Sequence, residues 1–225
     1  LFFCNEMKEK EQGGDSSPVN SDGIKMMSKS FFKTKKIADS FSKKRIKIYE
    51  KIIDKKCKKI LDVGCGPGVF FEPFDNLSVY WRGLEINPYW INFGKENNIP
   101  ISNNNLNEIN EKFDVITSHQ VLEHVEEPLE FINKLKKLLN PGGLIHLELP
   151  NNESLTSKIR KISPIISTDY GFIQPPMHMR AYSKKTLEFL LKKSNFDLVK
   201  IFSCGNNDKI WGQVRNYSVL QKLIY

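Results

Sequence analysis

The stretch "ILDVGCGPGVF", residues 60–70, decides the fold of this chain. A run of apolar residues ends at Val63, and three alternating glycines follow at once: Gly64, Gly66 and Gly68. Glycine adopts turns that other residues avoid, and it lets a ligand approach the backbone closely. In open α/β sheets, ligands bind beyond the carboxyl ends of the strands. The stretch therefore predicts a first strand that runs into a binding loop.

The rest of the chain alternates between strand and helix patterns. We expect strands at residues 58–64, 78–86, 99–102, 112–118, 144–150 and 197–203, with a last one within 211–220. Helices are expected at 69–75, 87–98, 128–140 and 183–196, the second capped by Asn87 and the third ended by 141–143. Such alternation indicates a parallel sheet covered on both faces, with the final two strands antiparallel at one edge.

The chain of 225 residues divides into a tail, a basic segment and one domain. Residues 1–27 are polar and read as a flexible tail, 28–57 as a basic helical segment, and 58–225 as the domain, with 150–182 as an insertion over the substrate. Residues 25–59 hold 14 Lys and Arg against three acids, so the remaining residues sum to −3 of the net +8. We interpret this charge as a solvated basic face, and nucleic acid is not the expected partner.

The sequence carries less information about cellular location and oligomeric state than about the fold. No apolar run approaches the roughly 18–20 residues that span a bilayer, so no transmembrane segment is expected. The four cysteines form no CxxC pair or zinc pattern, which favours free thiols in a reducing cytoplasm. The pattern leaves the oligomeric state open.

The glycine loop matches neither of two common phosphate-binding motifs. A dinucleotide fingerprint needs Gly or Ala three residues after Gly66, where Val69 stands, and a P-loop needs a following Gly-Lys-Ser/Thr. The loop is instead preceded by Asp62, and Glu85 ends the next strand 17 residues after Gly68. A carboxylate at that place can accept both hydroxyls of a ribose, each through a charge-assisted hydrogen bond.

These segments, together with "GLEINP", "FDVITSHQVLEHVEEP" and "LLNPGGLIHLELPN", resemble the class I S-adenosylmethionine (SAM)-dependent methyltransferases. The resemblance covers residues 45–203 and is nearest to the ubiquinone-pathway O-methyltransferases and bacterial small-molecule methyltransferases. It implies an α/β, Rossmann-like seven-stranded, mostly parallel sheet with an antiparallel edge strand and helices on both faces. It also implies that SAM lies against the loop, with cofactor roles for Asp62, Gly64, Gly66, Gly68 and Glu85.

Four further cofactor contacts follow from the same resemblance. Arg45 lies 19 residues before Gly64 and suits the SAM carboxylate. Asn105 and Leu106 take the place of an adenine-binding pair, although the acid that many members carry there is absent. His119 occupies a position that packs near the methionine part of SAM.

The candidate catalytic residues are His119, His178, Glu123 and His124. The SAM sulfonium is already electrophilic, so a hydroxyl acceptor needs only alignment and removal of a proton. Histidine titrates near neutral pH and is the natural base. A Glu-x-x-Glu-His metal motif occupies this segment in resembling small-RNA methyltransferases, but Gln120 replaces its first acid here, so no metal is expected.

The expected function is methyl transfer from SAM to a small molecule, at a hydroxyl of a sugar or quinone precursor. Two alternatives remain: an RNA methyltransferase that uses the basic segment, and a non-catalytic SAM-binding protein. Salt-dependent RNA binding would favour the first, and SAM binding without turnover on any acceptor the second.

Overall fold

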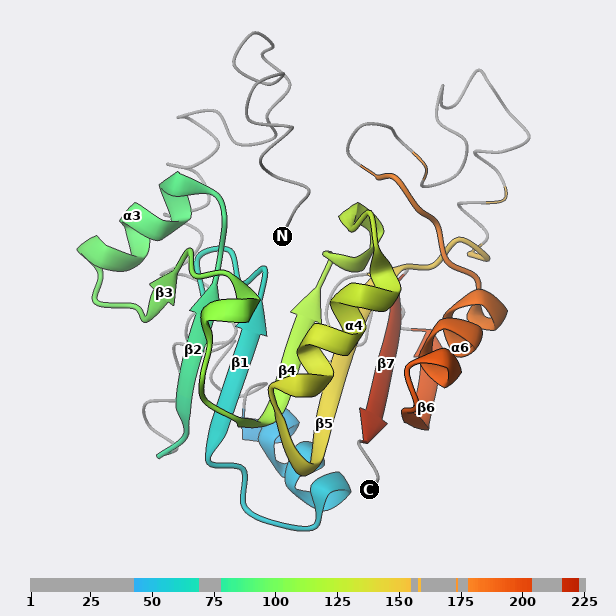
Figure 1. Cartoon of the computed structure of the whole chain (residues 1–225), viewed down its shortest axis with the longest axis horizontal. Coiled ribbons are helices and arrows are strands. Elements are labelled where there is room, and N and C mark those ends of the chain that lie inside the picture. The colour runs from blue at the N-terminus through green and yellow to red at the C-terminus, as the bar shows by residue number, and fades with distance from the viewer. Residues whose placement is uncertain are drawn as a thin grey trace, which may run out of the picture.

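The computed structural model describes residues 43–68, 78–154, 158, 173, 178–203 and 216–222. Its strands form one sheet in the order β3-β2-β1-β4-β5-β7-β6 (Figure 1). Their bounds are Lys59–Val63 (β1), Tyr80–Leu84 (β2), Ile101–Ser102 (β3), Phe113–His119 (β4), Leu139–Pro150 (β5), Asp197–Ser203 (β6) and Asn216–Lys222 (β7).

The helices lie on both sides of this sheet. A first helix spans residues 43–53, followed by α3 (Pro88–Glu96), α4 (Pro128–Lys137) and α6 (Lys184–Lys193), with short 3-10 turns η3 (Leu106–Glu108) and η4 (Leu122–His124). None of the described helices is long and apolar enough to cross a membrane. The expected tail at 1–27, the start of the basic segment and the helix expected at 69–75 lie outside the described residues.

The sheet has the expected seven strands, but its antiparallel strand is not at the edge. Strands β3, β2, β1, β4 and β5 form five consecutive parallel neighbours. β7 pairs antiparallel with both β5 and β6. The outermost strand β6 therefore runs in the same direction as the first five, and the prediction of an antiparallel edge strand is wrong. β7 follows β6 in the sequence but lies between β5 and β6 in the sheet.

Local signals in the sequence place most element ends correctly. The side chain of Asn87 accepts a hydrogen bond from the backbone N–H of Tyr89 at 3.0 Å, which caps α3 as expected. α4 and β5 differ, because α4 ends at Lys137 rather than at residue 140 and β5 begins at Leu139 rather than at residue 144. The pairing of β5 with β4 shifts from Phe113↔Leu139 to Val115↔Leu144, so the Pro-Gly-Gly turn forms an irregularity at the start of this strand.

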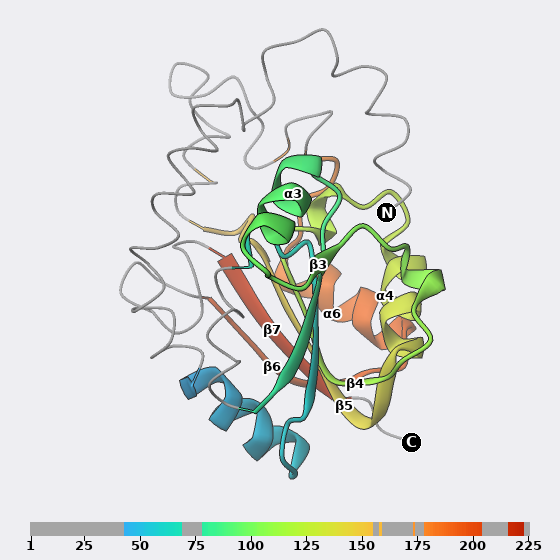
Figure 2. The same ribbon diagram turned by 90° about the vertical axis from the view of Figure 1, so that its left-hand side faces the viewer.

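Two apolar clusters cover the two faces of the sheet. On one face, α4 and α6 pack through Phe131, Ile132, Leu187 and Leu191 onto a wide core. On the other face, Ile46, Tyr49 and Ile53 of helix 43–53 pack together with residues of α3 and the sheet. Figure 2 shows helix 43–53 on one side of the strands and α4 with α6 on the other. Helix 43–53 thus shares the core of the strands that follow it.

The face under helix 43–53 turns polar toward the carboxyl ends of its strands. The early residues Ile60, Val115 and Leu144 on that face are apolar. Strand alternation places the following residues on the same face, and these are Asp62 on β1, Thr117 and His119 on β4, and His146 and Glu148 on β5. On the opposite face, Val63, Leu147 and Leu149 are apolar at the ends of their strands, although Ser118 of β4 also lies there. Polar chemistry is thereby concentrated where parallel sheets bind ligands.

Candidate functional site

The glycine loop leaves β1 through three residues with positive φ. Gly64, Gly66 and Gly68 have φ values of +76°, +54° and +76°. A Cβ on Gly64 would overlap Cγ2 of Val121, and one on Gly68 would lie 3.0 Å from the ring of Trp81. A Cβ on Gly66 would meet no atom within 4 Å. Gly64 and Gly68 are therefore required by packing, whereas Gly66 borders open space that a ligand can enter.

Glu85 holds this loop against the end of β2. One carboxylate oxygen accepts a hydrogen bond from the N–H of Gly66 at 2.7 Å. The other accepts from the N–H groups of Ile86 at 2.8 Å and Asn87 at 2.9 Å. A carboxylate offers about four acceptor positions, so Glu85 retains capacity for a ligand hydroxyl beside Gly66. The predicted ribose acid thus lies next to the open part of the loop.

Asp62 and Arg45 lie beneath the loop in the polar half of the sheet face. Asp62 is buried and accepts a hydrogen bond from Oγ1 of Thr117 at 2.7 Å. Burial raises the pKa of Asp62 to about 7, and the nearby charge of Arg45 opposes that rise. Arg45 is itself buried at 2% exposure on helix 43–53. Two residues far apart in the sequence thus place opposite charges at one place.

The two residues expected at adenine have structural roles at η3. The side chain of Asn105 accepts a hydrogen bond from the N–H of Asn107 at 3.0 Å and caps that turn. Leu106 is 3% exposed and packs in the core. Leu106 therefore offers little surface to an adenine ring, and an adenine contact in this region stays a prediction.

Segment 178–182 is fastened onto η4, which follows β4. The backbone N–H groups of Met179 and Arg180 both donate to the carbonyl oxygen of Glu123 at 3.1 Å. The side chain of Arg180 donates to the carbonyls of Val125 and Glu126, and the hydroxyl of Tyr182 donates to that of Leu122. This docking brings His178 next to residues that precede it by more than fifty positions.

Glu123, His124 and His178 consequently form one cluster. Their ligand-type atoms lie within 4.8 Å of one another, and the imidazole rings of His124 and His178 meet edge to face at 4.8 Å. Glu123 is 1% exposed, and neither of its carboxylate oxygens has a hydrogen-bond partner in the described part of the chain. Burial raises the pKa of Glu123 to about 8, with a smaller contribution from the charge of Glu148. The set could accept a proton or hold a divalent ion.

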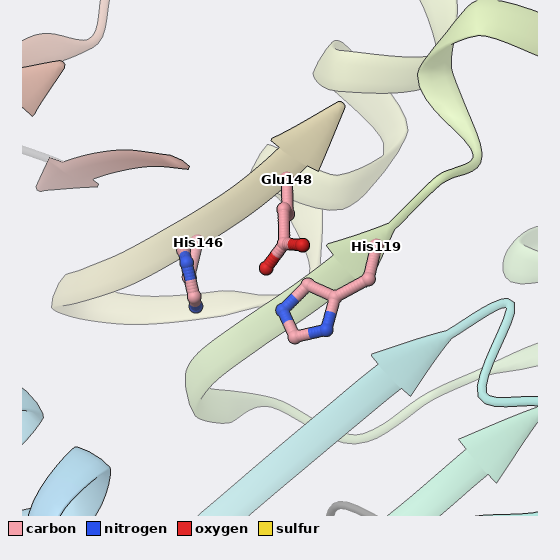
Figure 3. Close-up of side chains that lie close together, drawn as sticks. All are labelled: His119, His146 and Glu148. Carbon is pink, nitrogen blue, oxygen red and sulfur yellow. The ribbon is translucent and has the colours of Figure 1, made fainter. Parts of the chain in front are cut away.

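His119 belongs to a different cluster, with His146 and Glu148. The ligand-type atoms of these three also lie within 4.8 Å of one another, and the two imidazole rings are 4.9 Å apart. Figure 3 shows the carboxylate of Glu148 reaching between the two rings. Burial lowers the pKa of His119 to about 3 and that of His146 well below its usual range, with Arg45 adding to both. Both imidazoles are therefore neutral at physiological pH.

The four predicted catalytic residues thus divide between two neighbouring clusters. Glu123, His124 and His178 come together, whereas His119 joins His146 and Glu148 of β5, which were not among the predicted site residues. Tyr49 was also missed, although its hydroxyl lies 2.7 Å from Nδ1 of His146 across 97 residues of sequence. The available signal was alternation: His146 and Glu148 are polar residues two apart in an otherwise apolar strand.

A parallel sheet with a glycine loop and a strand-end carboxylate at its carboxyl edge defines a class of Rossmann-like domains that bind nucleotide-type cofactors. Within this class, the chain belongs to the methyltransferase family, because the profile described as "Methyltransferase domain" matches residues 34–201. The matched range contains helix 43–53, both clusters and every predicted cofactor residue.

Individual relatives agree with this assignment. A mitochondrial ubiquinone biosynthesis O-methyltransferase of Dictyostelium discoideum is 28% identical over 201 residues, covering 76% of this chain and 60% of the relative. A ubiquinone biosynthesis O-methyltransferase of Haemophilus ducreyi is 32% identical over 108 residues, covering 42% of this chain and 46% of the relative. The chain therefore spans less than two thirds of these relatives.

Solved structures show the same fold. The plantazolicin methyltransferase BpumL in complex with SAH superimposes with a TM-score of 0.66 at 17% identity over the whole of both chains. A SAM-dependent methyltransferase from Archaeoglobus fulgidus gives a TM-score of 0.60 at 20% identity, covering 88% of this chain and 98% of its own. At identities this low, the structural likeness shows the fold alone.

The loop of this chain fits the methyl donor of its family, S-adenosylmethionine. The open space at Gly66 is the region that a substitution would fill, and the carboxylate of Glu85 borders it. Backbone close to a ligand, with an acceptor for ribose hydroxyls beside it, is the combination that a nucleoside requires.

Proposed function

We propose that this protein transfers the methyl group of S-adenosylmethionine to a hydroxyl oxygen of a small molecule. The observation that carries the proposal is the bond between the N–H of Gly66 and Glu85, which sets an acceptor carboxylate beside open loop backbone. Family membership and O-methyltransferase relatives support it. When bound, SAM supplies an electrophilic methyl group. The protein therefore has to bind SAM, align the acceptor hydroxyl with the methyl group and exclude water.

The cofactor side is assigned to residues around the glycine loop. Gly64, Gly66 and Gly68 shape the backbone under the methionine half, and Glu85 accepts a hydrogen bond from a ribose hydroxyl. Arg45 lies buried near Asp62, and a guanidinium there suits the methionine carboxylate. His119 directly follows Ser118, which pairs with Val63 of β1, so it borders the same end of the cofactor.

The acceptor side is assigned to Glu123, His124 and His178. Glu123 and His124 follow β4 at the carboxyl edge of the sheet, where the acceptor has to reach the methyl group, and segment 178–182 brings His178 to them. The cluster would either take the proton of the acceptor hydroxyl directly or hold a divalent ion that lowers the pKa of that hydroxyl. Chelation separates the two uses: activity that survives EDTA supports direct proton transfer, and loss restored by Mg²⁺ supports the ion.

The acceptor class follows from the relatives. Those named above act in ubiquinone biosynthesis according to their names, which favours a hydroxyl of a quinone precursor over a sugar hydroxyl for this chain. Since one of them is described as mitochondrial, the cytoplasmic location stays a prediction.

Calorimetry with S-adenosylhomocysteine tests the cofactor part of the proposal. Glu85→Ala should weaken binding by at least about tenfold, because a charge-assisted hydrogen bond contributes roughly 1.5–3 kcal/mol. Glu188→Ala, on α6 away from the loop, is the matched control and should bind like the wild type. Absence of binding by the folded wild-type protein would refute the proposal. Methyl-labelled SAM, cell extract and mass spectrometry would then identify the acceptor.

A further inference from the structure

The cluster of His119, His146 and Glu148 has no assigned part in the proposed reaction, apart from the position of His119 beside the cofactor. Its geometry follows directly from the sheet. His119 on β4 is the direct neighbour of Glu148 on β5, and His146 lies two positions earlier on the same face. All three side chains therefore project to one side of two adjacent parallel strands, with their ligand-type atoms within 4.8 Å of one another.

Burial makes this arrangement unusual. His146 is fully buried and Glu148 is 4% exposed, while His119 is half-buried and forms the side nearer to solvent. A carboxylate in such a place needs positive charge nearby, and a bound ion would supply it together with Arg45, whose charge acts on both histidines. Figure 3 shows the Glu148 carboxylate pointing toward the space between the imidazoles, which is where a shared ion would lie.

Tyr49 supplies a supporting contact of the kind found around metal ligands. Its hydroxyl lies 2.7 Å from Nδ1 of His146, inside the core under helix 43–53. A histidine that binds a metal through one ring nitrogen commonly has its other nitrogen held by such an outer partner, which fixes the orientation of the ring. Since Nδ1 lies against the Tyr49 hydroxyl, Nε2 is the atom through which His146 would bind an ion.

We propose that His119, His146 and Glu148 bind one divalent transition-metal ion of the zinc class. Two imidazole nitrogens and one carboxylate are a known ligand set for Zn²⁺, and imidazole ligands favour such ions over Mg²⁺. The site is distinct from the cluster of Glu123, His124 and His178, which shares no residue with it. The ion would join β4 to β5 next to the glycine loop, and helix 43–53 would support it through Tyr49.

Arg45 moderates the affinity of this site. Its charge acts on both His119 and His146, so it repels a cation there. The carboxylates of Glu148 and Asp62 oppose that effect from the same face of the sheet. We therefore expect a site that takes up metal from solution reversibly, rather than one that retains it through purification.

Cobalt spectroscopy tests the proposal without using catalysis or SAM. Metal-free protein titrated with Co²⁺ should develop visible absorption bands of a low-coordinate site at one equivalent. The bands should persist in the double variant His124→Ala, His178→Ala, which removes the other cluster. In that double-variant background they should disappear on Glu148→Gln, which keeps the size of the side chain, and on His146→Ala. Tyr49→Phe should weaken Co²⁺ binding by roughly tenfold, as expected for an outer partner of a ligand.

Three results would overturn the proposal. The first is bands that survive both Glu148→Gln and His146→Ala in the double-variant background, and the second is bands that vanish in the double variant itself. The third is wild-type protein that takes up no Co²⁺. Far-ultraviolet circular dichroism on every variant verifies folding, and Glu148→Gln decides the matter where His146→Ala fails to fold. Because SAH calorimetry does not involve this metal, failure here leaves the proposed function standing, and the converse also holds.

Discussion

Gly64 and Gly66 are both glycines with positive φ, but their surroundings give them different tasks. A methyl group on Gly64 would overlap the side chain of Val121, whereas one on Gly66 would enter open space. We predict that Gly64→Ala lowers the free energy of unfolding by about 2–4 kcal/mol, from overpacking together with backbone strain. Gly66→Ala should cost only about 1–2 kcal/mol and should weaken SAH binding by at least about tenfold, because the added methyl occupies the ligand space.

Urea unfolding and SAH calorimetry on the two variants check this difference. The two alanine variants act as controls for each other, since the chemical change and the sign of φ are the same. A Gly66→Ala protein with unchanged SAH affinity would contradict the assignment of that open space to the cofactor.

At the scale of elements, the buried bond between Tyr49 and His146 fastens helix 43–53 to β5. We predict that Tyr49→Phe lowers the free energy of unfolding by about 1–3 kcal/mol, because it leaves a buried imidazole nitrogen without its partner. Tyr80→Phe is the matched control, since Tyr80 is 48% exposed and its hydroxyl reaches Glu111 only at 3.5 Å. That variant should stay within about 0.5 kcal/mol of the wild type. Equal losses in both variants, measured by urea unfolding, would argue against a special role for the Tyr49 bond.

Elements were predictable from the sequence where the signal is local. Alternation, helix capping at Asn87 and the turn at Gly64 to Gly68 each depend on neighbours in sequence, and the structure has β1, α3 and α6 near their expected places. The meeting of Tyr49, His146 and His119 depends instead on which strands are adjacent and which helix covers them. No pattern within "LIHLELP" reveals that its His and Glu face a histidine of another strand.

The same distinction explains the order of strands in the whole molecule. Seven strands could be counted from the pattern, and the final two were expected to be antiparallel to each other, as they are. Whether β6 or β7 pairs with β5 is decided by long-range pairing, and both arrangements satisfy the same alternation of apolar residues. Residues 204–215, which connect these two strands, lie outside the described part of the chain.

The stability of the whole molecule should depend on pH through four buried groups that act in opposite directions. Asp62 and Glu123 have folded pKa values of about 7 and about 8, above their ordinary values. The folded protein therefore keeps protons that the unfolded chain releases, and stability falls as pH rises through those pKa values. His119 and His146 have lowered pKa values, so the unfolded chain gains protons below about pH 6.5 and stability rises with pH up to that point.

Between about pH 4.5 and 6.5 the two pairs oppose each other, and above about pH 6.5 only the two carboxyl groups still titrate. We therefore predict a nearly level free energy of unfolding between about pH 4.5 and 6.5 and a fall from there to about pH 8, with a slope of up to about 1.4 kcal/mol per pH unit for each proton. Urea unfolding of metal-free protein at half-unit pH intervals measures this curve. Asp62→Asn removes one of the two carboxyl groups that titrate in this range, so the free energy of unfolding should fall less steeply with pH. Asp197→Asn, on the surface strand β6, should leave that slope unchanged. A stability that keeps rising to pH 8 would mean that Asp62 and Glu123 are already ionised in the folded protein, with a positive charge held beside each of them.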